Sequence, residues 1–140
     1  MIPFYSDDLP YLTTEQMIEV DRAMMEDFKI DLIRMMENAG RALAIVARQR
    51  FLESDPEGRR VTVLAGTAGN GGGALVAARR LHNWGAEGRV FITKPFDAFT
   101  PVPAQQLDIL HRMNVPVDEA ARVEGSEAPD VVLDGVIGYA

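Results

Sequence analysis

The sequence predicts a doubly wound α/β domain, in which helices cover both faces of a mainly parallel sheet. Short apolar, β-branched runs alternate with segments of helical periodicity over the carboxyl two-thirds of the chain, and this alternation is typical of a parallel sheet. A glycine-rich segment, residues 66–73, separates the first strand from the next helix. The 140 residues, 47% of them hydrophobic, are enough for one domain with a real core.

Two helices are expected ahead of the sheet. Thr13 is a favourable N-cap for the first, and Gln16 three residues later completes a capping box. Apolar residues then recur at helical spacing, so one face of this helix should be buried. The residues of that face are Met17, Val20, Met24 and Phe28.

The second helix is expected to begin near Asp31 and to end at about Phe51. Within it, Gly40 lowers helix stability by roughly 1 kcal/mol relative to alanine. Either another backbone approaches the helix at Gly40 or the helix simply tolerates the residue, and the pattern leaves both readings open. The expected buried stripe consists of Leu32, Met36, Ala39, Leu43 and Val46.

Four strands and two more helices complete the expected order. The strands are residues 61–65, 89–93, 115–117 and 131–133, and the helices follow the glycine-rich segment to Gly85 and run from Pro103 to Met113. Residues 131–140 have the pattern of a buried strand leaving a sheet, whose edge would be bare if the chain stopped there. We therefore expect residues 1–140 to form a single domain that is incomplete at its carboxyl end.

Composition excludes several classes of protein. Lys and Arg number 14 against 21 Asp and Glu, a net charge of -7, which is the wrong sign for a surface that binds nucleic acid. The absence of cysteine excludes disulfides and thiolate metal sites. No run approaches the roughly 18 apolar residues that a membrane span needs. We expect a cytoplasmic protein that binds a small molecule rather than nucleic acid or a membrane.

The glycine-rich segment from Gly66 to Gly73 is the first candidate site. Glycines permit positive φ and close backbone approach, and the following helix offers free N–H groups and the positive end of its dipole to an anion. A phosphate or pyrophosphate group of a nucleotide is the natural ligand, and a tight strand-to-helix turn without a ligand is the alternative. The spacing matches neither the dinucleotide fingerprint nor a Walker loop.

Three other side chains could carry chemistry. Asn70 offers an amide oxygen that suits a hard cation, although asparagine also favours a left-handed turn. Asp134 follows the last strand, where ligands of open α/β sheets collect, but it could instead cap the next turn. Lys94 ends the second strand and could be a phosphate partner or proton donor, or a solvated lysine.

Three segments resemble one known family. Residues 36–41 read Met-Glu-Asn-Ala-Gly-Arg, residues 66–81 contain the glycine-rich segment followed by Val-Ala-Ala-Arg, and residues 131–139 join an apolar run to an aspartate. In their order and spacing, these segments are similar to the YjeF N-terminal domain family, the NAD(P)H-hydrate epimerases.

The resemblance implies a three-layer α/β/α, Rossmann-like domain with an isomerase activity. Members of this family interconvert the R and S epimers of hydrated NADH and NADPH in metabolite repair, a step that feeds a partner NAD(P)H-hydrate dehydratase. The family uses a bound potassium ion and is commonly homodimeric. The resemblance therefore implies hydrated NAD(P)H as substrate and potassium as cofactor for this chain.

The resemblance also assigns roles to individual residues. Asn70 and Asp134 would be potassium ligands, and Lys94 falls roughly where some members carry a lysine at the end of this strand, which makes it the candidate catalytic residue. The residues that would line the site of the hydrated cofactor are Gly69, Asn70, Gly71, Gly72, Gly73, Gly138, Tyr139 and Ala140.

Two departures from the family pattern favour an alternative function. The family's loop usually reads Gly-Asn-Asn-Gly-Gly-Asp-Gly, whereas in this chain Gly69 replaces the first Asn, Gly73 replaces the Asp and Ala74 replaces the last Gly. Members also hold an Asp-x-Pro-Ser-Gly segment, which supplies the acid/base aspartate, and residues 1–140 contain no such segment. The alternative is a noncatalytic nucleotide-binding or protein-interaction module of the same fold.

Overall fold

A computed structural model describes residues 2–139 and contains the expected order of elements. No helix among these residues is long and apolar enough to cross a membrane. The principal elements are α1 (Thr14–Arg22), α2 (Leu32–Phe51), β1 (Arg60–Ala65), α3 (Gly69–Asn83), β2 (Glu87–Ile92), α4 (Pro101–Arg112), β3 (Val117–Glu119) and β4 (Val131–Gly135). A π-turn, η1 (Ala23–Asp27), extends α1, and two 3-10 segments, η2 (Phe96–Ala98) and η3 (Ala120–Gly125), follow β2 and β3.

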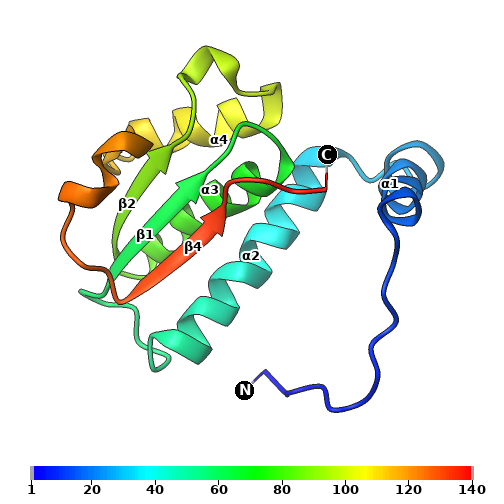
Figure 1. The fold of residues 1–140 in the computed structure, drawn as a ribbon, viewed down its shortest axis with the longest axis horizontal. Coiled ribbons are helices and arrows are strands. Elements are labelled where there is room, and N and C mark those ends of the chain that lie inside the picture. The colour runs from blue at the N-terminus through cyan, green and yellow to red at the C-terminus, as the bar shows by residue number, and fades with distance from the viewer. Residues whose placement is uncertain (1, 140) are drawn as a thin grey trace.

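The four strands form one parallel sheet in the order β3-β2-β1-β4 (Figure 1). From β1 the chain moves outward through β2 and β3, and then returns to place β4 on the other side of β1. The direction of winding therefore reverses between β1 and β4. In open α/β sheets, ligands bind at this point, outside the carboxyl ends of the strands.

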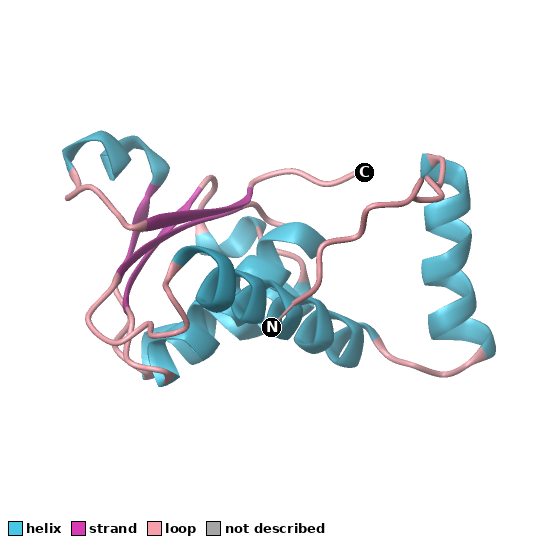
Figure 2. Ribbon diagram, turned by 90° about the horizontal axis from the view of Figure 1, so that it is seen from below, coloured by secondary structure: helices cyan, strands magenta, loops and turns pink. Residues whose placement is uncertain are grey.

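The helices lie in layers against the sheet (Figure 2). Helix α3 packs directly on β1, β2 and β4, and α2 and α4 pack on α3. The apolar side chains of Val61 and Val63 are fully buried in this layer with Leu75 of α3. On the opposite face, η3 lies beside Phe91, which is 3% exposed. The prediction of a parallel sheet with helical segments on both sides is confirmed.

Helix α1 begins as the sequence predicts, but its predicted buried face is wrong. Thr13 caps the helix, and Gln16 completes the capping box. However, no residue of α1 is buried, and Val20 and Phe28 are 39% and 74% exposed. The helix stands apart from the layered body of the molecule (Figure 2), so no neighbouring element within residues 2–139 covers this face.

Helix α2 spans the predicted residues, but of its predicted stripe only Met36 is buried among the described residues. Its buried residues are Met36, Gly40, Ala44 and Ala47, while Leu32, Ala39 and Val46 are exposed and Leu43 is half-buried. The stripe centres on small residues because α2 and α3 pack at very short range. A Cβ atom added to Gly40 would lie 2.4 Å from Cβ of Val76 and 2.6 Å from the carbonyl oxygen of Gly73. Close approach is thus the correct reading of Gly40.

Candidate functional site

A pocket of about 500 Å³ lies at the carboxyl ends of β1 and β4. One wall is built by the residues that follow these two strands, and the other by α1 and the start of α2. The pocket therefore lies at the point where the winding of the sheet reverses. Its lining residues are Met17, Asp21, Leu32, Met35, Met36, Ala39, Thr67, Ala68, Gly69, Asn70, Gly71, Val136, Ile137, Gly138 and Tyr139.

The glycine-rich segment is largely helical, which corrects the expectation of a loop from Gly66 to Gly73. Helix α3 already begins at Gly69, and none of these glycines has a positive φ. At Gly66 and Gly71, the role of glycine is close approach instead. A Cβ at Gly71 would lie 1.8 Å from the carbonyl oxygen of Gly66, and a Cβ at Gly66 would lie 2.0 Å from that of Val136. The backbone after β1 therefore touches both the first turn of α3 and the backbone after β4.

The first turn of α3 is available to an anion. Its N-cap is Ala68, and in the described part of the chain no side chain caps the free N–H groups. Thr100, before α4, donates hydrogen bonds from its backbone N–H and its hydroxyl to the carbonyl oxygen of Thr67, each at 3.1 Å. These bonds hold the short turn ahead of the helix. The N–H groups and the helix dipole can then receive a phosphate group.

Asn70 lies in the first turn of α3, so the left-handed turn that the sequence left open is wrong for this residue. Its side-chain Nδ2 donates a hydrogen bond of 2.8 Å to the carbonyl oxygen of Ile137. The bond ties α3 to the segment that follows β4, where a Cβ at Gly138 would lie 3.2 Å from Asn70 Cγ. With Nδ2 engaged in this way, Oδ1 is the coordinating atom that Asn70 can offer to a ligand.

The structure does not bring Asp134 or Lys94 into the lining of this pocket. Asp134 is exposed, and its Oδ1 accepts a hydrogen bond of 3.0 Å from the backbone N–H of Val136. Asp134 thus stabilises the turn after β4. The next residue, Gly135, contacts the Asn70 backbone. Lys94 is exposed and follows the end of β2.

The predicted cofactor-binding residues divide into two groups. Gly69, Asn70, Gly71, Gly138 and Tyr139 line the pocket together, whereas Gly72 and Gly73 are buried in α3 outside its lining, and Ala140 lies outside the described residues. A Cβ at Gly72 would lie 2.4 Å from Met36, so this glycine serves the packing of α2 on α3.

Sequence reasoning missed the second wall of the pocket, which is formed by α1 and the first two turns of α2. Met17, Met35 and Met36 provide apolar lining there, and Asp21 provides a carboxylate. The hydroxyl of Tyr139 donates a short hydrogen bond to Asp21 Oδ2, and this bond raises the pKa of Tyr139 above its ordinary value. The spacing of Met17 and Asp21, one helical turn apart, is the signal that could have placed both on one face.

Glu37 holds this wall against α3. Its carboxylate accepts hydrogen bonds from Arg79 and from Arg80, which are adjacent on α3. The three side chains are between 18% and 31% exposed, so the ion pairs are only partly screened by water. The pairing fixes α2 beside the glycine-rich turn.

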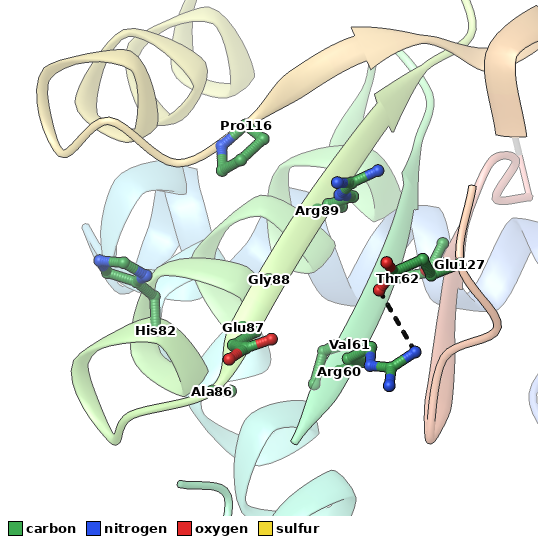
Figure 3. A pocket seen from close by; sticks show the side chains of 10 residues that line it. All are labelled: Arg60, Val61, Thr62, His82, Ala86, Glu87, Gly88, Arg89, Pro116 and Glu127. Carbon is green, nitrogen blue, oxygen red and sulfur yellow. Dashed lines mark ion pairs between the residues drawn. The ribbon is translucent and has the colours of Figure 1, made fainter. Parts of the chain in front are cut away.

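A second hollow, of about 340 Å³, lies at the opposite, amino-terminal ends of β1 and β2 (Figure 3). Its charged side chains carry both signs, and Arg60 is paired with Glu127 at 3.3 Å. Ligands of open α/β sheets bind at the carboxyl ends of the strands rather than at this end. The pocket beside the glycine-rich turn is therefore the better candidate site.

The strand order, the reversal of winding and the glycine-rich first turn of α3 define a Rossmann-like α/β domain with its ligand pocket at the β1–β4 crevice. A family model described as "YjeF-related protein N-terminus" matches residues 32–140. The chain belongs to this family, as the sequence resemblance predicted.

Proteins similar to this chain carry related names. The chain is 40% identical over 128 residues to the NAD(P)H-hydrate epimerase of Dehalogenimonas lykanthroporepellens, covering 91% of this chain and 51% of that protein. It is 36% identical to the bifunctional NAD(P)H-hydrate repair enzyme Nnr of Hyperthermus butylicus, covering 86% of this chain and 23% of that protein. The crystal structure of yeast ynu0 has a TM-score of 0.78 and 28% identity, covering 94% of this chain and 58% of that one.

Proposed function

We propose that this protein is an NAD(P)H-hydrate epimerase, an isomerase that interconverts the R and S epimers of hydrated NADH and NADPH. The observation that carries the proposal is the pocket in which the uncapped first turn of α3 meets the segment after β4. The names of similar proteins agree with this activity. The chain spans about half the length of the epimerases it matches, so the activity belongs to the full-length protein.

The proposed chemistry needs binding and proton transfer but no redox step. Epimerisation requires that the hydroxyl on a hemiaminal-like carbon be protonated and expelled, and that water add from the other face. The N–H groups of Gly69 and Gly71 would bind phosphate oxygens, and the methionine side chains would exclude bulk water. Lys94, at the end of β2, remains our proposed proton donor from this chain, beside residues supplied by the rest of the protein.

We include a potassium ion in the proposal, with Asn70 and Asp134 as its ligands from this chain. Potassium is a hard cation that prefers oxygen ligands. Asn70 Oδ1 and the Asp134 carboxylate supply oxygens, and Gly135, which follows Asp134, lies against the Asn70 backbone, since a Cβ at Gly135 would lie 2.8 Å from the carbonyl oxygen of Asn70. These donor atoms suit an oxygen-coordinated ion by their chemistry, although Asp134 lies outside the described lining of the pocket. Such an ion would add positive charge beside the bound phosphates.

We also propose an oligomeric state, a partner activity and a cellular location for the enzyme. The exposed apolar side chains of Tyr11, Ile18 and Phe28, on or beside α1, are suited to contact with a second copy in a homodimer. The name of the bifunctional relative supports action together with a second repair activity, which we take to be an NAD(P)H-hydrate dehydratase. The cytoplasm is the location that we propose for both.

A noncatalytic nucleotide-binding module is the second candidate. Gly73 occupies the position where the family pattern has a carboxylate, and a Cβ at this position would meet no atom within 4 Å. The space for a side chain is present although the side chain is not. A domain that lost its carboxylate in this way would keep the backbone groups that bind phosphate.

The test is epimer interconversion of hydrated NADPH by the full-length protein, with and without potassium, beside a Gly73→Asp variant. We expect turnover by the wild-type protein that depends on potassium. Since a Cβ at position 73 would meet no atom within 4 Å, we expect the variant to fold and to act as a control for the altered loop. Turnover in the variant alone would identify a binding protein derived from an epimerase, and our proposal would be wrong.

A further inference from the structure

The pocket has two ends of opposite electrostatic character. At one end, the first turn of α3 presents free N–H groups and the positive end of the helix dipole. At the other end, Asp21 of α1 contributes a carboxylate. Among the described residues that line the pocket there is no Lys, Arg or His. Phosphate groups are therefore attracted to the α3 end and repelled from the α1 end.

Among residues 2–139, no cation forms an ion pair with the Asp21 carboxylate. Arg22, the next residue, pairs instead with Glu19, Glu26 and Asp27 on the outer side of α1. Within residues 2–139, the hydrogen-bond partner of Asp21 is the hydroxyl of Tyr139, which binds Oδ2. Oδ1 is left to accept a hydrogen bond from another donor.

The bond between Asp21 and Tyr139 connects residues that are 118 positions apart in the sequence. It directly links α1 to the segment that follows β4. Because α1 buries no residue of its own, this bond sets where the carboxylate lies relative to the α3 end of the pocket. Asp21 is half-buried beside Met17 and Met35, and hydrogen bonds to its oxygens replace the contacts with water that this partial burial removes.

We propose that Asp21 determines specificity in this pocket by accepting a hydrogen bond from a hydroxyl group of the ligand, and that Tyr139 is a positioning residue that orients the Asp21 carboxylate. The ligand class is a phosphorylated molecule with a neutral, hydroxyl-bearing end: its phosphates bind the first turn of α3, and its hydroxyl faces α1. This inference rests on the proposed function, in which two hydroxyl sources exist, the ribose and the hydrated ring.

The experiment compares equilibrium binding of NADH and of hydrated NADH to the full-length protein and three variants. Asp21→Asn keeps an acceptor for Tyr139 but removes the charge that strengthens the ligand's hydrogen bond. Tyr139→Phe removes the orienting bond and keeps the carboxylate. Glu15→Gln is the matched control, because it removes one acidic charge from α1 at an exposed position outside the pocket.

We expect Asp21→Asn to weaken binding about tenfold, Tyr139→Phe to weaken it about threefold, and Glu15→Gln to leave it unchanged. Equal weakening for the two ligands would assign the hydroxyl to the ribose, and weakening for hydrated NADH alone would assign it to the ring. In steady-state kinetics with hydrated NADH, Asp21→Asn should raise KM and change kcat little, as removal of a binding contact does.

Three results would overturn the proposal. Unchanged binding by Asp21→Asn would exclude contact between Asp21 and the ligand. A larger effect of Tyr139→Phe than of Asp21→Asn would show that the pair only attaches α1. Failure of the wild-type protein to bind either ligand would overturn this inference together with the nucleotide assignment. Since binding needs no turnover, an inactive protein that binds and responds to Asp21→Asn would refute only the epimerase activity.

Discussion

The two walls of the pocket are held in place by different means. The α3 wall has backbone packed on backbone, and Gly71, Gly72 and six following residues of α3 are buried or nearly so. In the other wall, helix α1 has no buried residue and stands apart from the layered body of the molecule (Figure 2). The phosphate-binding groups are thus rigid, while the wall that carries Asp21 depends on a few side-chain contacts. Substitutions in the two walls should therefore have different consequences.

The largest effect is expected at Gly71. A Cβ at this position would lie 1.8 Å from the carbonyl oxygen of Gly66, and backbone cannot move aside as a flexible side chain can. Gly71→Ala should lower the free energy of unfolding by about 3 kcal/mol, because overpacking of this kind distorts the surrounding structure. Chemical denaturation measures the change.

Gly73→Ala is the matched control for Gly71→Ala, since its Cβ meets open space. Alanine is favoured over glycine within a helix by about 0.5–1 kcal/mol, so this variant should be as stable as the wild type or more so. Similar losses of stability in both variants would contradict our account of close approach at Gly71.

Loss of the Glu37 charge should have the next largest effect. Glu37→Gln leaves Arg79 and Arg80 partly buried without a carboxylate, and we expect the free energy of unfolding to fall by about 2 kcal/mol. Urea denaturation measures this. Asp108→Asn breaks an exposed ion pair with Arg112 and should change stability little. Equal effects of the two substitutions would mean that Glu37 does not hold α2 on α3.

Lys94→Ala tests whether the exposed side chain after β2 takes part in catalysis. We expect kcat to fall about tenfold and the melting temperature to stay unchanged. This loss of kcat is small for a proton donor because the Lys94 side chain is solvated. Lys29→Asn is a suitable control, because Lys29 has a φ of 58° that asparagine tolerates. Wild-type kcat in Lys94→Ala would remove Lys94 from the site.

The smallest effect concerns the titration of Tyr139. The hydrogen bond to Asp21 raises the pKa of Tyr139 in the folded protein. The bond therefore contributes fully to the attachment of α1 below the unfolded value of about 10, and the contribution is lost as pH rises through the folded value. The pKa of Tyr139 is measured by an absorbance titration of the wild-type protein, from which the titration of the Tyr139→Phe variant is subtracted. If Asp21→Asn left the pKa of Tyr139 unchanged, the hydrogen bond to Asp21 would not be the cause of the raised pKa.

The sequence predicted features that depend on neighbouring residues. The capping box at Thr13 and Gln16 consists of short-range hydrogen bonds, so it forms as the pattern indicates. The second helix likewise begins near Asp31 as expected, and the structure shows Asp31 as its N-cap. Predictions that depended on contacts between elements were less successful. The glycine-rich turn was expected to be a loop, because glycine is a poor helix former. Contacts with Gly66 and Gly135 outweigh that preference and start the helix at Gly69.

By itself, the sequence determined the order of helices and strands, the parallel sheet, the family and half of the pocket, because each depends on local patterns or on motifs that the family shares. Only the tertiary structure decided which residues form the other half. The chain brings Asp21 to Tyr139 across a separation of 118 residues. Such a contact depends on how α1 folds back after the π-turn and where the segment after β4 leaves the sheet, and neither direction is encoded in the residues beside Asp21.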